Sequence, residues 1–108
     1  MKAGPLDRRV QFQRPQLVDN GVEEVEEFAN HGVPIWASKT DVSDGERLRA
    51  DQMSASLTSR FVVRWSSFTA GLTAKDRIAY GDDTFEIFGI KEIGRREGLE
   101  ITAGARVD

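Results

Sequence analysis

The clearest pattern of hydrophobic and polar residues in the chain runs from Met53 to Trp65. Apolar or small residues occupy every second position of this stretch, and mostly polar residues lie between them. An α-helix would scatter the first set around its axis, so the pattern predicts a β-strand with one buried face. At about 3.4 Å per residue the strand would span roughly 44 Å, well beyond the usual length of about five or six residues. We therefore expect it to contact more than one partner or to project past its own sheet.

The first third of the chain predicts a strand followed by a long polar connection. Val10 and Phe12 alternate with polar residues, which indicates a half-buried strand that Pro15 ends or kinks. Asp19-Asn20-Gly21 is a strong turn signal, because Asn and Gly tolerate a positive φ. We interpret residues 19–32 as one exposed connection and leave open a short strand within it, near Val22 to Phe28.

Residues 33–42 resume the apolar alternation, with Ile35 facing one side and Trp36 the other. Proline has no backbone N–H to give to a neighbouring strand. Pro34 therefore favours a position for this strand at the edge of the sheet.

A short helix is predicted between this third strand and the long central strand. Ser43 is followed three residues later by Glu46, which is the spacing of a capping box at the start of a helix. One or two helical turns over residues 44–52 follow from it. Few apolar residues could anchor them, so we expect this segment to be loosely held.

The C-terminal half continues with short strands joined by turns. Residues 77–80 and 85–90 predict a hairpin with its turn at 81–84, and Leu99 to Ala103 predict a last strand. The apolar parity changes within the second strand of the hairpin. That change predicts a bulge near Gly89 or a segment covered on both faces.

These segments together predict an all-β fold. It is a small antiparallel β-barrel or sandwich of five to six strands, with one short helix or loop between the third strand and the long central strand. A chain of 108 residues has room for one core, so we expect residues 1–108 to form a single domain. The residues expected in that core are Val10, Phe12, Ile35, Leu57, Phe61, Val63, Trp65, Ile78, Tyr80, Phe85, Ile87, Leu99 and Ile101.

Composition narrows the classes of function. The chain has no cysteine, which excludes disulfides, thiol nucleophiles and thiolate metal sites. Its one histidine, His31, lies in a polar stretch, so neither a histidine-based metal cluster nor a Ser-His-Asp arrangement can form within one chain. No phosphate-binding glycine loop and no apolar run long enough for a membrane span are present. We therefore expect a protein that is not an enzyme, with no cofactor, no metal and no membrane contact.

The charge of the chain does not favour stable binding of nucleic acid. Its net charge is −3, whereas proteins that hold DNA by its phosphates normally carry a basic face. The acidic excess is concentrated in residues 19–27, where no Lys or Arg occurs, and such a run is ordinarily a solvated segment. Its members are Asp19, Glu23, Glu24, Glu26 and Glu27.

Several short motifs follow one another at a characteristic spacing. They are Gly4, Leu6-Asp7-Arg8-Arg9-Val10, Trp36-Ala37, Ser43-Asp44-Gly45-Glu46 with Ala50, Arg64, Arg77-Ile78 and the Tyr80-Gly81 to Phe85-Glu86-Ile87 hairpin. In this order they resemble the head-tail joining proteins of tailed bacteriophages, also called head closure or stopper proteins, which have relatives in phage-like gene transfer agents. The resemblance covers the chain from Gly4 to about Ile101, and only the acidic stretch departs from it.

The resemblance implies a β-barrel subunit of a homo-oligomeric ring below the portal and the head adaptor. Such a ring closes the filled head, lets double-stranded DNA pass through its channel without specific binding, and offers a surface to a tail terminator or tail tube protein. It acts at the head-tail junction of a virion or phage-like particle that is assembled in the host cytoplasm. The alternative is a small β-barrel adaptor, unrelated to virions, that binds a peptide by strand addition.

The resemblance also associates the channel with the segment between the Trp-Ala strand and the central strand, here residues 39–55. The channel-facing or gating residues expected there are Asp41, Ser43, Asp44, Glu46, Arg47 and Arg49. An acidic wall, from these residues or from the 19–27 stretch, would repel the phosphates of a sliding duplex. Exposed arginines of one copy could pair with the acidic stretch of another and set the register between copies. The residues expected to contact a neighbouring subunit or partner are Glu23, Glu24, Glu26, Glu27, Arg60 and Arg64.

Overall fold

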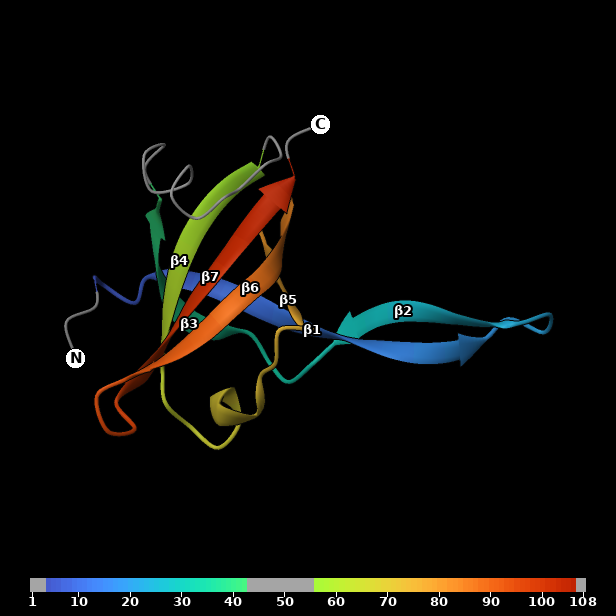
Figure 1. The fold of residues 1–108 in the computed structure, drawn as a ribbon, viewed down its shortest axis with the longest axis horizontal. Helices are drawn as coiled ribbons and strands as arrows, with labels where there is room; N and C mark the ends of the chain where they lie inside the picture. Colours follow the sequence, from blue (N-terminus) through green and yellow to red (C-terminus); the bar gives the residue numbers. More distant parts are fainter. Residues whose placement is uncertain (1–3, 43–55, 107–108) are drawn as a thin grey trace.

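The computed structural model describes residues 4–42 and 56–106, and the helix predicted over 44–52 lies outside them (Figure 1). Strands make up most of the described part, and one short 3-10 helix, η1, accompanies them. In chain order the elements are β1 (Arg8–Asp19), β2 (Glu24–Asn30), β3 (Ile35–Asp41), β4 (Ser56–Arg64), η1 (Thr69–Gly71), β5 (Arg77–Tyr80), β6 (Asp83–Ile93) and β7 (Gly98–Arg106).

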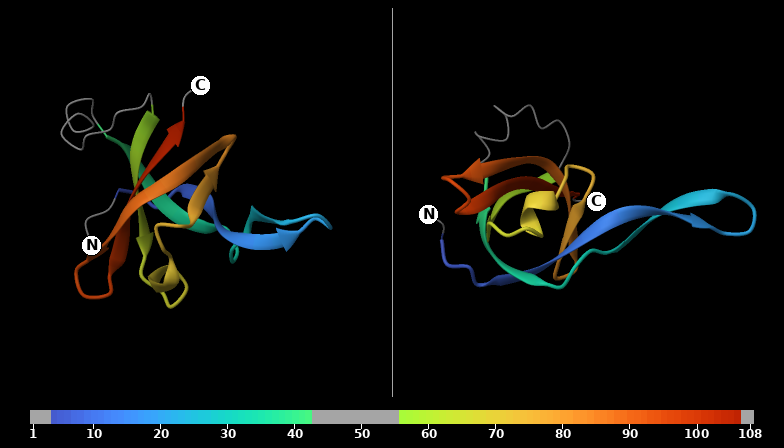
Figure 2. Two further views of the ribbon diagram at one scale, coloured as in Figure 1. Left: turned by 45° about the vertical axis from the view of Figure 1, so that its right-hand side comes forward. Right: turned by 90° about the horizontal axis from the view of Figure 1, so that it is seen from below.

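The seven strands of the described chain form one antiparallel sheet that curls until two of its strands meet again. The strand order is β2-β1-β3-β4-β7-β6-β5, and β1 also pairs with β5 where Gln11–Gln13 lie beside Arg77–Ala79. Figure 2 shows this barrel-like arrangement from two further sides. The predicted antiparallel all-β fold is therefore confirmed. It has more strands than the five to six expected, because part of the supposed connection at 19–32 also pairs.

The β1–β2 hairpin leaves the barrel as an arm. The first half of β1 pairs with β3 and β5, whereas its second half pairs with β2, from Gln13 opposite Asn30 out to Asp19 opposite Glu24. This second half extends to the right of the barrel in Figure 1, and the molecule measures 48 Å along its longest axis against 22 Å along its shortest. We name residues 14–29 the arm.

Pro15 does not end the first strand, because β1 continues to Asp19. The short strand left open near Val22 to Phe28 is present as β2 over Glu24–Asn30, so residues 19–32 are not one exposed loop. Proline removes a backbone donor, but β5 pairs with β1 only as far as Gln13. Beyond Gln13, the edge of β1 that faces away from β2 therefore has no partner strand, and Pro15 interrupts no hydrogen bonds there.

The turn predicted at the tip of the arm is confirmed. Gly21 has a φ of 90°, a left-handed conformation that glycine adopts without strain. Asn20 Oδ1 accepts hydrogen bonds from the backbone N–H groups of Val22 and Glu23 at 3.0 and 2.9 Å. These local bonds fix the tip and with it the register of the hairpin.

The third strand lies between two others and is not an edge. The start of β3 pairs with β1 through Ile35–Ala37, and the rest pairs with β4 through Ala37–Asp41. Pro34 precedes the strand and interrupts no pairing, so the predicted edge position is wrong. The long central strand is β4, which pairs with β3 on one side and with β7 on the other. Its contact with two partners was expected, although within the described residues β4 has nine residues and ends before Trp65, where the predicted strand ended.

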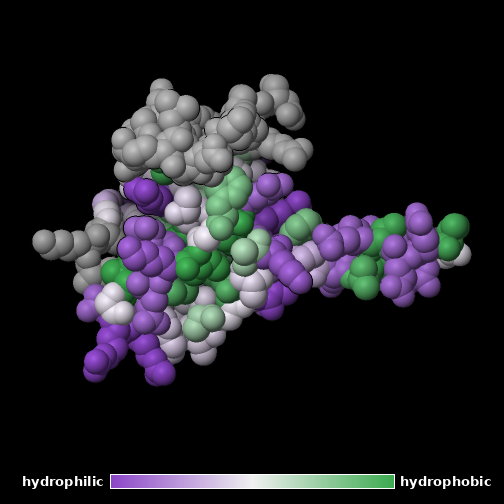
Figure 3. Space-filling model, viewed as in Figure 1, coloured by the Kyte–Doolittle hydropathy of each residue, from purple (hydrophilic) through white to green (hydrophobic). Residues whose placement is uncertain are grey.

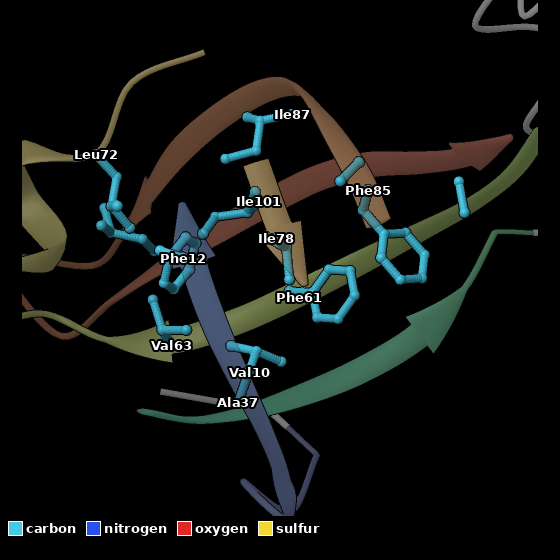
Figure 4. Packing of buried hydrophobic residues seen from close by; sticks show 13 residues of the cluster. Val10, Phe12, Ala37, Phe61, Val63, Leu72, Ile78, Phe85, Ile87 and Ile101 are labelled. Atoms are coloured by element: carbon cyan, nitrogen blue, oxygen red, sulfur yellow. The ribbon is translucent and has the colours of Figure 1, made fainter. Parts of the chain in front are cut away.

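The core fills the interior of the barrel, where side chains from all the surrounding strands converge (Figure 4). Phe61 of β4 lies edge-on against Phe85 of β6, with ring centroids 5.1 Å apart. Of the expected core residues, nine are buried: Val10, Phe12, Phe61, Val63, Ile78, Phe85, Ile87, Leu99 and Ile101. Ile35, Trp65 and Tyr80 are only partly buried against this cluster, and the side chain of Leu57 lies outside the described part. The buried hydrophobic residues that were not predicted are Ala37, Leu72, Ala103 and Ala105.

The change of apolar parity in β6 corresponds to a bulge. The register between β6 and β7 shifts between Ile87 and Gly89, which confirms the predicted irregularity. Phe88 consequently faces outward with 43% of its surface exposed, and Ile90 turns back onto the core. The bulge thus bends the strand where the sheet curls.

We predict that Phe61→Ala destabilises the fold far more than Trp65→Ala. Phe61 is fully buried at the centre of the core, and truncation of such an aromatic costs about 3–5 kcal/mol. Trp65 follows β4 at the mouth of the barrel, is partly exposed and stacks under Arg96 at 5.0 Å, so its truncation leaves less of a cavity. The free energy of unfolding in urea, followed by circular dichroism, measures the difference. Equal losses for the two variants would contradict this assignment of the core.

Candidate assembly surfaces

The arm presents an acidic surface with apolar residues exposed among the charges. Leu17 and Val22 are 69% and 92% exposed, and Figure 3 shows hydrophilic and hydrophobic residues side by side along the arm. Asp19 lies directly opposite Glu24 in the hairpin, and like charges at such a position destabilise the pairing of strands. The predicted contact residues on the arm are all exposed; they are Glu23, Glu24, Glu26 and Glu27. These features destabilise the hairpin on its own and favour a role in binding a partner.

An ion pair between Arg14 and Asp76 fastens the root of the arm to the barrel. Arg14 Nε and Nη2 donate to the two carboxylate oxygens of Asp76 at 2.8 and 2.9 Å, and the side chain of Asp76 is fully buried. The backbone N–H of Thr73 donates to the same carboxylate at 2.8 Å. Burial by itself raises the pKa of Asp76, but the hydrogen bonds from Arg14 and Thr73 outweigh it and lower that pKa overall. The pair therefore stays charged and holds β1 against the turn that precedes β5.

Arg77 of β5 fastens both strands of the hairpin close to the same point. Its guanidinium lies 3.9 Å from the ring centroid of Phe28 in β2, and its Nε donates to Gln13 Oε1 in β1 at 2.7 Å. A hollow of about 590 Å³ opens beside this contact, and its wall includes Lys75, Asp82 and Phe28. Charges of both signs line it, so it has no single electrostatic character.

A smaller apolar groove opens near the start of β1 and β3. Its volume is about 210 Å³, and Trp36, which is 53% exposed, forms one wall. The guanidinium of Arg9 lies 5.5 Å from the centroid of the Trp36 ring. The residues that line this groove, which we name the Trp36 groove, are Leu6, Ile35, Trp36, Arg64, Ser66 and Thr69.

Of the two predicted contact arginines, Arg60 lies in the middle of β4 and Arg64 at its C-terminal end. Arg60 is half-buried opposite Thr40 of β3, whereas Arg64 is exposed and lines the Trp36 groove. They lie four positions apart along the strand, which corresponds to roughly 13 Å. The structure therefore does not bring Arg60 and Arg64 into one patch, and neither lies on the arm.

Asp41 is the predicted gating residue that the described part contains. It ends β3, at the point where the chain leads into residues 43–55. Its Oδ1 accepts hydrogen bonds from Lys39 Nζ at 2.7 Å and from Ser59 Oγ at 2.9 Å, and these contacts lower the pKa of Asp41. The other residues expected to gate or face a channel lie outside the described part; they are Ser43, Asp44, Glu46, Arg47 and Arg49.

The polar surroundings of His31 predict an exposed side chain, and this prediction is wrong. His31 is half-buried, and its ring lies 5.0 Å from that of Phe68. No group of three or more His, Asp or Glu residues in 4–42 and 56–106 is placed to hold a metal ion. Nor does any helix in these ranges have the length and apolarity required to cross a membrane.

Two features of these surfaces were missed by sequence reasoning. The Arg14–Asp76 pair joins residues that are 62 positions apart, and no local pattern signals such a contact. The Trp36 groove had a signal, because the alternation in residues 33–42 already places Trp36 on the face opposite Ile35. The sequence did not indicate that Leu6 and Arg64 lie beside Trp36, because only the closed sheet brings these residues together.

We predict that Asp76→Asn lowers the free energy of unfolding at pH 7 by about 1.5–3 kcal/mol, the range for hydrogen bonds to charged groups. Because the pKa of Asp76 is lowered in the folded state, its stabilisation is complete above the unfolded value of about 3.9 and is lost as the pH falls through the folded value. Urea unfolding between pH 7 and pH 2.5 should therefore show a smaller acid loss in the variant than in the native chain. Asp82→Asn, at an exposed turn, is the matched control. Parallel pH profiles for Asp76→Asn and the native chain would refute the role of this pair.

Comparison with known structures places the fold beside two solved chains. The solution structure of protein SF1141 from Shigella flexneri 2a superposes with a TM-score of 0.74 and 26% identity, over 97% of this chain and 96% of that chain. A chain from the virion of a native gene transfer agent particle superposes with a TM-score of 0.69 and 23% identity, over 97% of this chain and 98% of that one. The second likeness shows a shared fold. No curated protein sequence matches the chain.

Comparison with protein families gives a match over nearly the whole chain. The model of the phage head completion protein family matches residues 1–106, which include the barrel, the arm and the Trp36 groove. The resemblance seen in the short motifs is thereby confirmed. The chain belongs to the phage head completion protein family, and it is a structural protein of a phage or phage-like particle that associates with other head or tail proteins and takes part in closing the head.

Proposed function

We propose that the protein is a head-tail connector, or stopper, that forms a homo-oligomeric ring below the portal and head adaptor. The ring closes the DNA channel of the filled head and provides the surface to which a tail terminator or tail tube protein attaches. Membership of the head completion family supports a place at the end of the filled head. The peptide-binding adaptor unrelated to virions, which the sequence left open, does not fit that membership.

The observation that carries the ring is the arm. Six residue pairs, from Arg14 opposite Ala29 to Asp19 opposite Glu24, extend beyond the barrel as a two-stranded hairpin. Such a hairpin alone is marginally stable in water, and this one adds opposed carboxylates and exposed apolar side chains. The arm is thus anchored at its root and unfavourable at its free end. A hairpin of this kind is expected when contacts with a neighbouring subunit stabilise it.

The DNA channel is proposed to lie beside the segment between β3 and β4. Lys39 and Asp41 stand at the rim where this segment begins, and Ser43, Asp44 and Glu46 follow in sequence. Carboxylates on a channel wall repel phosphates. The duplex then slides past without the binding that basic residues would cause through release of counterions. Arg47 and Arg49 fit this arrangement as partners of those carboxylates. Closure is then steric, through the 39–55 segments of several subunits.

Deleting Asp44 to Asp51 is predicted to release DNA from heads that have been filled but carry no tail. The deletion shortens the proposed plug and leaves the strands on both sides of it in place. The DNA that remains protected from nuclease is measured in purified heads, together with the number of copies of this protein in each particle. The matched control replaces the same residues by a Gly-Ser segment of equal length, which tests whether bulk alone closes the channel.

The predicted result is several copies in each particle and a loss of protected DNA in the deletion variant. Heads that contain several copies of the shortened protein and still retain their DNA would show that the plug lies elsewhere. A single copy in each intact particle would contradict the ring itself.

A further inference from the structure

The tip of the arm and the Trp36 groove have matching chemistry. The arm exposes two apolar side chains, Leu17 and Val22, among carboxylates, and residues 16–28 contain no Lys or Arg. The groove offers the complement, because its floor is apolar. Arg9 lies over the exposed ring of Trp36, and Arg64 forms part of the wall.

Further charges around the groove are mostly basic. Arg96 stacks on Trp65, the residue that follows Arg64, and Arg95 precedes Arg96 in the same turn. Arg8 instead donates to the hydroxyl of Tyr80 at 3.0 Å. Two carboxylates lie among them. Asp7 is 3.7 Å from Arg8 Nε, and Glu97 lies in the same turn as Arg96 and already has a polar contact. Three arginines, Arg9, Arg64 and Arg96, therefore face two carboxylates near the groove, whereas residues 16–28 of the arm carry anions alone.

One chain cannot bring these two surfaces together. Arg9 lies near the start of β1 and Asp19 at its end, so about ten residues of extended strand, or roughly 34 Å, separate them. Figure 1 shows β1 running from the N-terminal side of the barrel, on the left, into the arm on the right. The Arg14–Asp76 pair fixes the arm in this direction, so it does not fold back onto its own groove.

We propose that the arm of one copy binds in the Trp36 groove of the next copy. Leu17 and Val22 then cover the apolar floor, and the arm's glutamates face Arg9 and Arg64. Each copy gives its arm on one side and receives an arm on the other, which is a heterologous, head-to-tail contact. Such a contact closes into a ring when the rotation between copies permits it. The inference rests on the ring proposed above and names the surfaces that build it.

The groove fits the arm better than the larger hollow beside the arm's root. That hollow is lined by charges of both signs, namely Lys75 and Arg77 with Asp76, Asp82, Asp83 and Glu86. Its carboxylates outnumber its cations even though Asp76 is paired with Arg14, so it receives an acidic arm less well. The Trp36 groove is lined by Arg64 and by no carboxylate. Charge therefore selects one of the two hollows and, with it, the order of copies around the ring.

The natural absence of cysteine makes this contact directly testable by cross-linking. A variant with Val22→Cys at the arm tip and Asp7→Cys beside the groove is incorporated into particles and treated with a short thiol-specific bifunctional reagent. Head-to-tail docking predicts a ladder of covalent multimers, because each copy then links to two neighbours. Val22→Cys alone and Asp7→Cys alone should give no ladder.

The matched control combines Val22→Cys with Asp82→Cys, an exposed position at the larger hollow, and should not give a ladder. Dimers from Val22→Cys alone would show that arms meet arms, and a ladder from the control pair would place the arm in the other hollow. Either result overturns the proposal. Particles with several copies but no Val22–Asp7 link would overturn the docking while leaving the ring intact. A single copy in each particle would refute both.

Charge reversal gives a second readout that does not depend on the position of a cysteine. Arg64→Glu in the cross-linking variant should reduce the linked fraction by roughly threefold at low salt, since exposed ion pairs are weak. Adding Glu23→Lys and Glu24→Lys should restore it. Circular dichroism of each variant separates this effect from misfolding. Loss without restoration in folded variants would contradict the pairing of these surfaces.

Discussion

The Arg14–Asp76 ion pair sets the point at which β1 ceases to be a barrel strand and becomes part of an arm. The first half of β1 lies between β3 and β5, so its backbone pairs on two sides. Beyond Gln13 the pairing partner is β2, and without an anchor the hairpin could swing about this point. A buried carboxylate that receives hydrogen bonds from Arg14 and Thr73 removes that freedom. The direction of the arm is therefore a property of the folded barrel.

A fixed arm changes what the exposed side chains can do. Leu17 and Val22 on a flexible loop would be ordinary surface residues, whereas on a rigid arm they form a shaped apolar tip among carboxylates. The anchor at the root also lowers the entropy lost when the arm binds, since the direction of the arm is already set. The same strand carries Arg8 and Arg9 at its other end, so β1 links the two surfaces that we assign to the subunit contact. The spacing between copies would then follow from the length of β1.

Sequence reasoning was most accurate where local patterns determine the structure. The hairpin at 77–80 and 85–90, the bulge near Gly89 and the turn at Asn20-Gly21 all follow from period-two alternation and turn chemistry, and all are present. It failed at Pro15 and Pro34, because the cost of a proline in a sheet depends on which strand lies beside it. That neighbour is set by the closure of the whole sheet.

The candidate surfaces show the same division. The acidic stretch is predicted to contact a partner from its charge alone, and its strand near Val22 to Phe28 could only be left open because glutamates are depleted in strands. Arg64 was assigned to a contact surface from its parity on β4, while Leu6 and Ile35 became its neighbours only through pairing between distant strands. The Arg14–Asp76 anchor left no trace in local sequence. Long-range polar contacts of this kind are accessible only from the fold.

The most direct test of this account is a cryo-electron microscopy reconstruction of the head-tail junction in the intact particle, at a resolution that separates strands. The account predicts a closed ring of this protein in which every arm lies across the Trp36 groove of its neighbour, with Arg64 close to the glutamates of the arm. A ring whose arms point away from their neighbours, toward the channel axis or the tail, would contradict it.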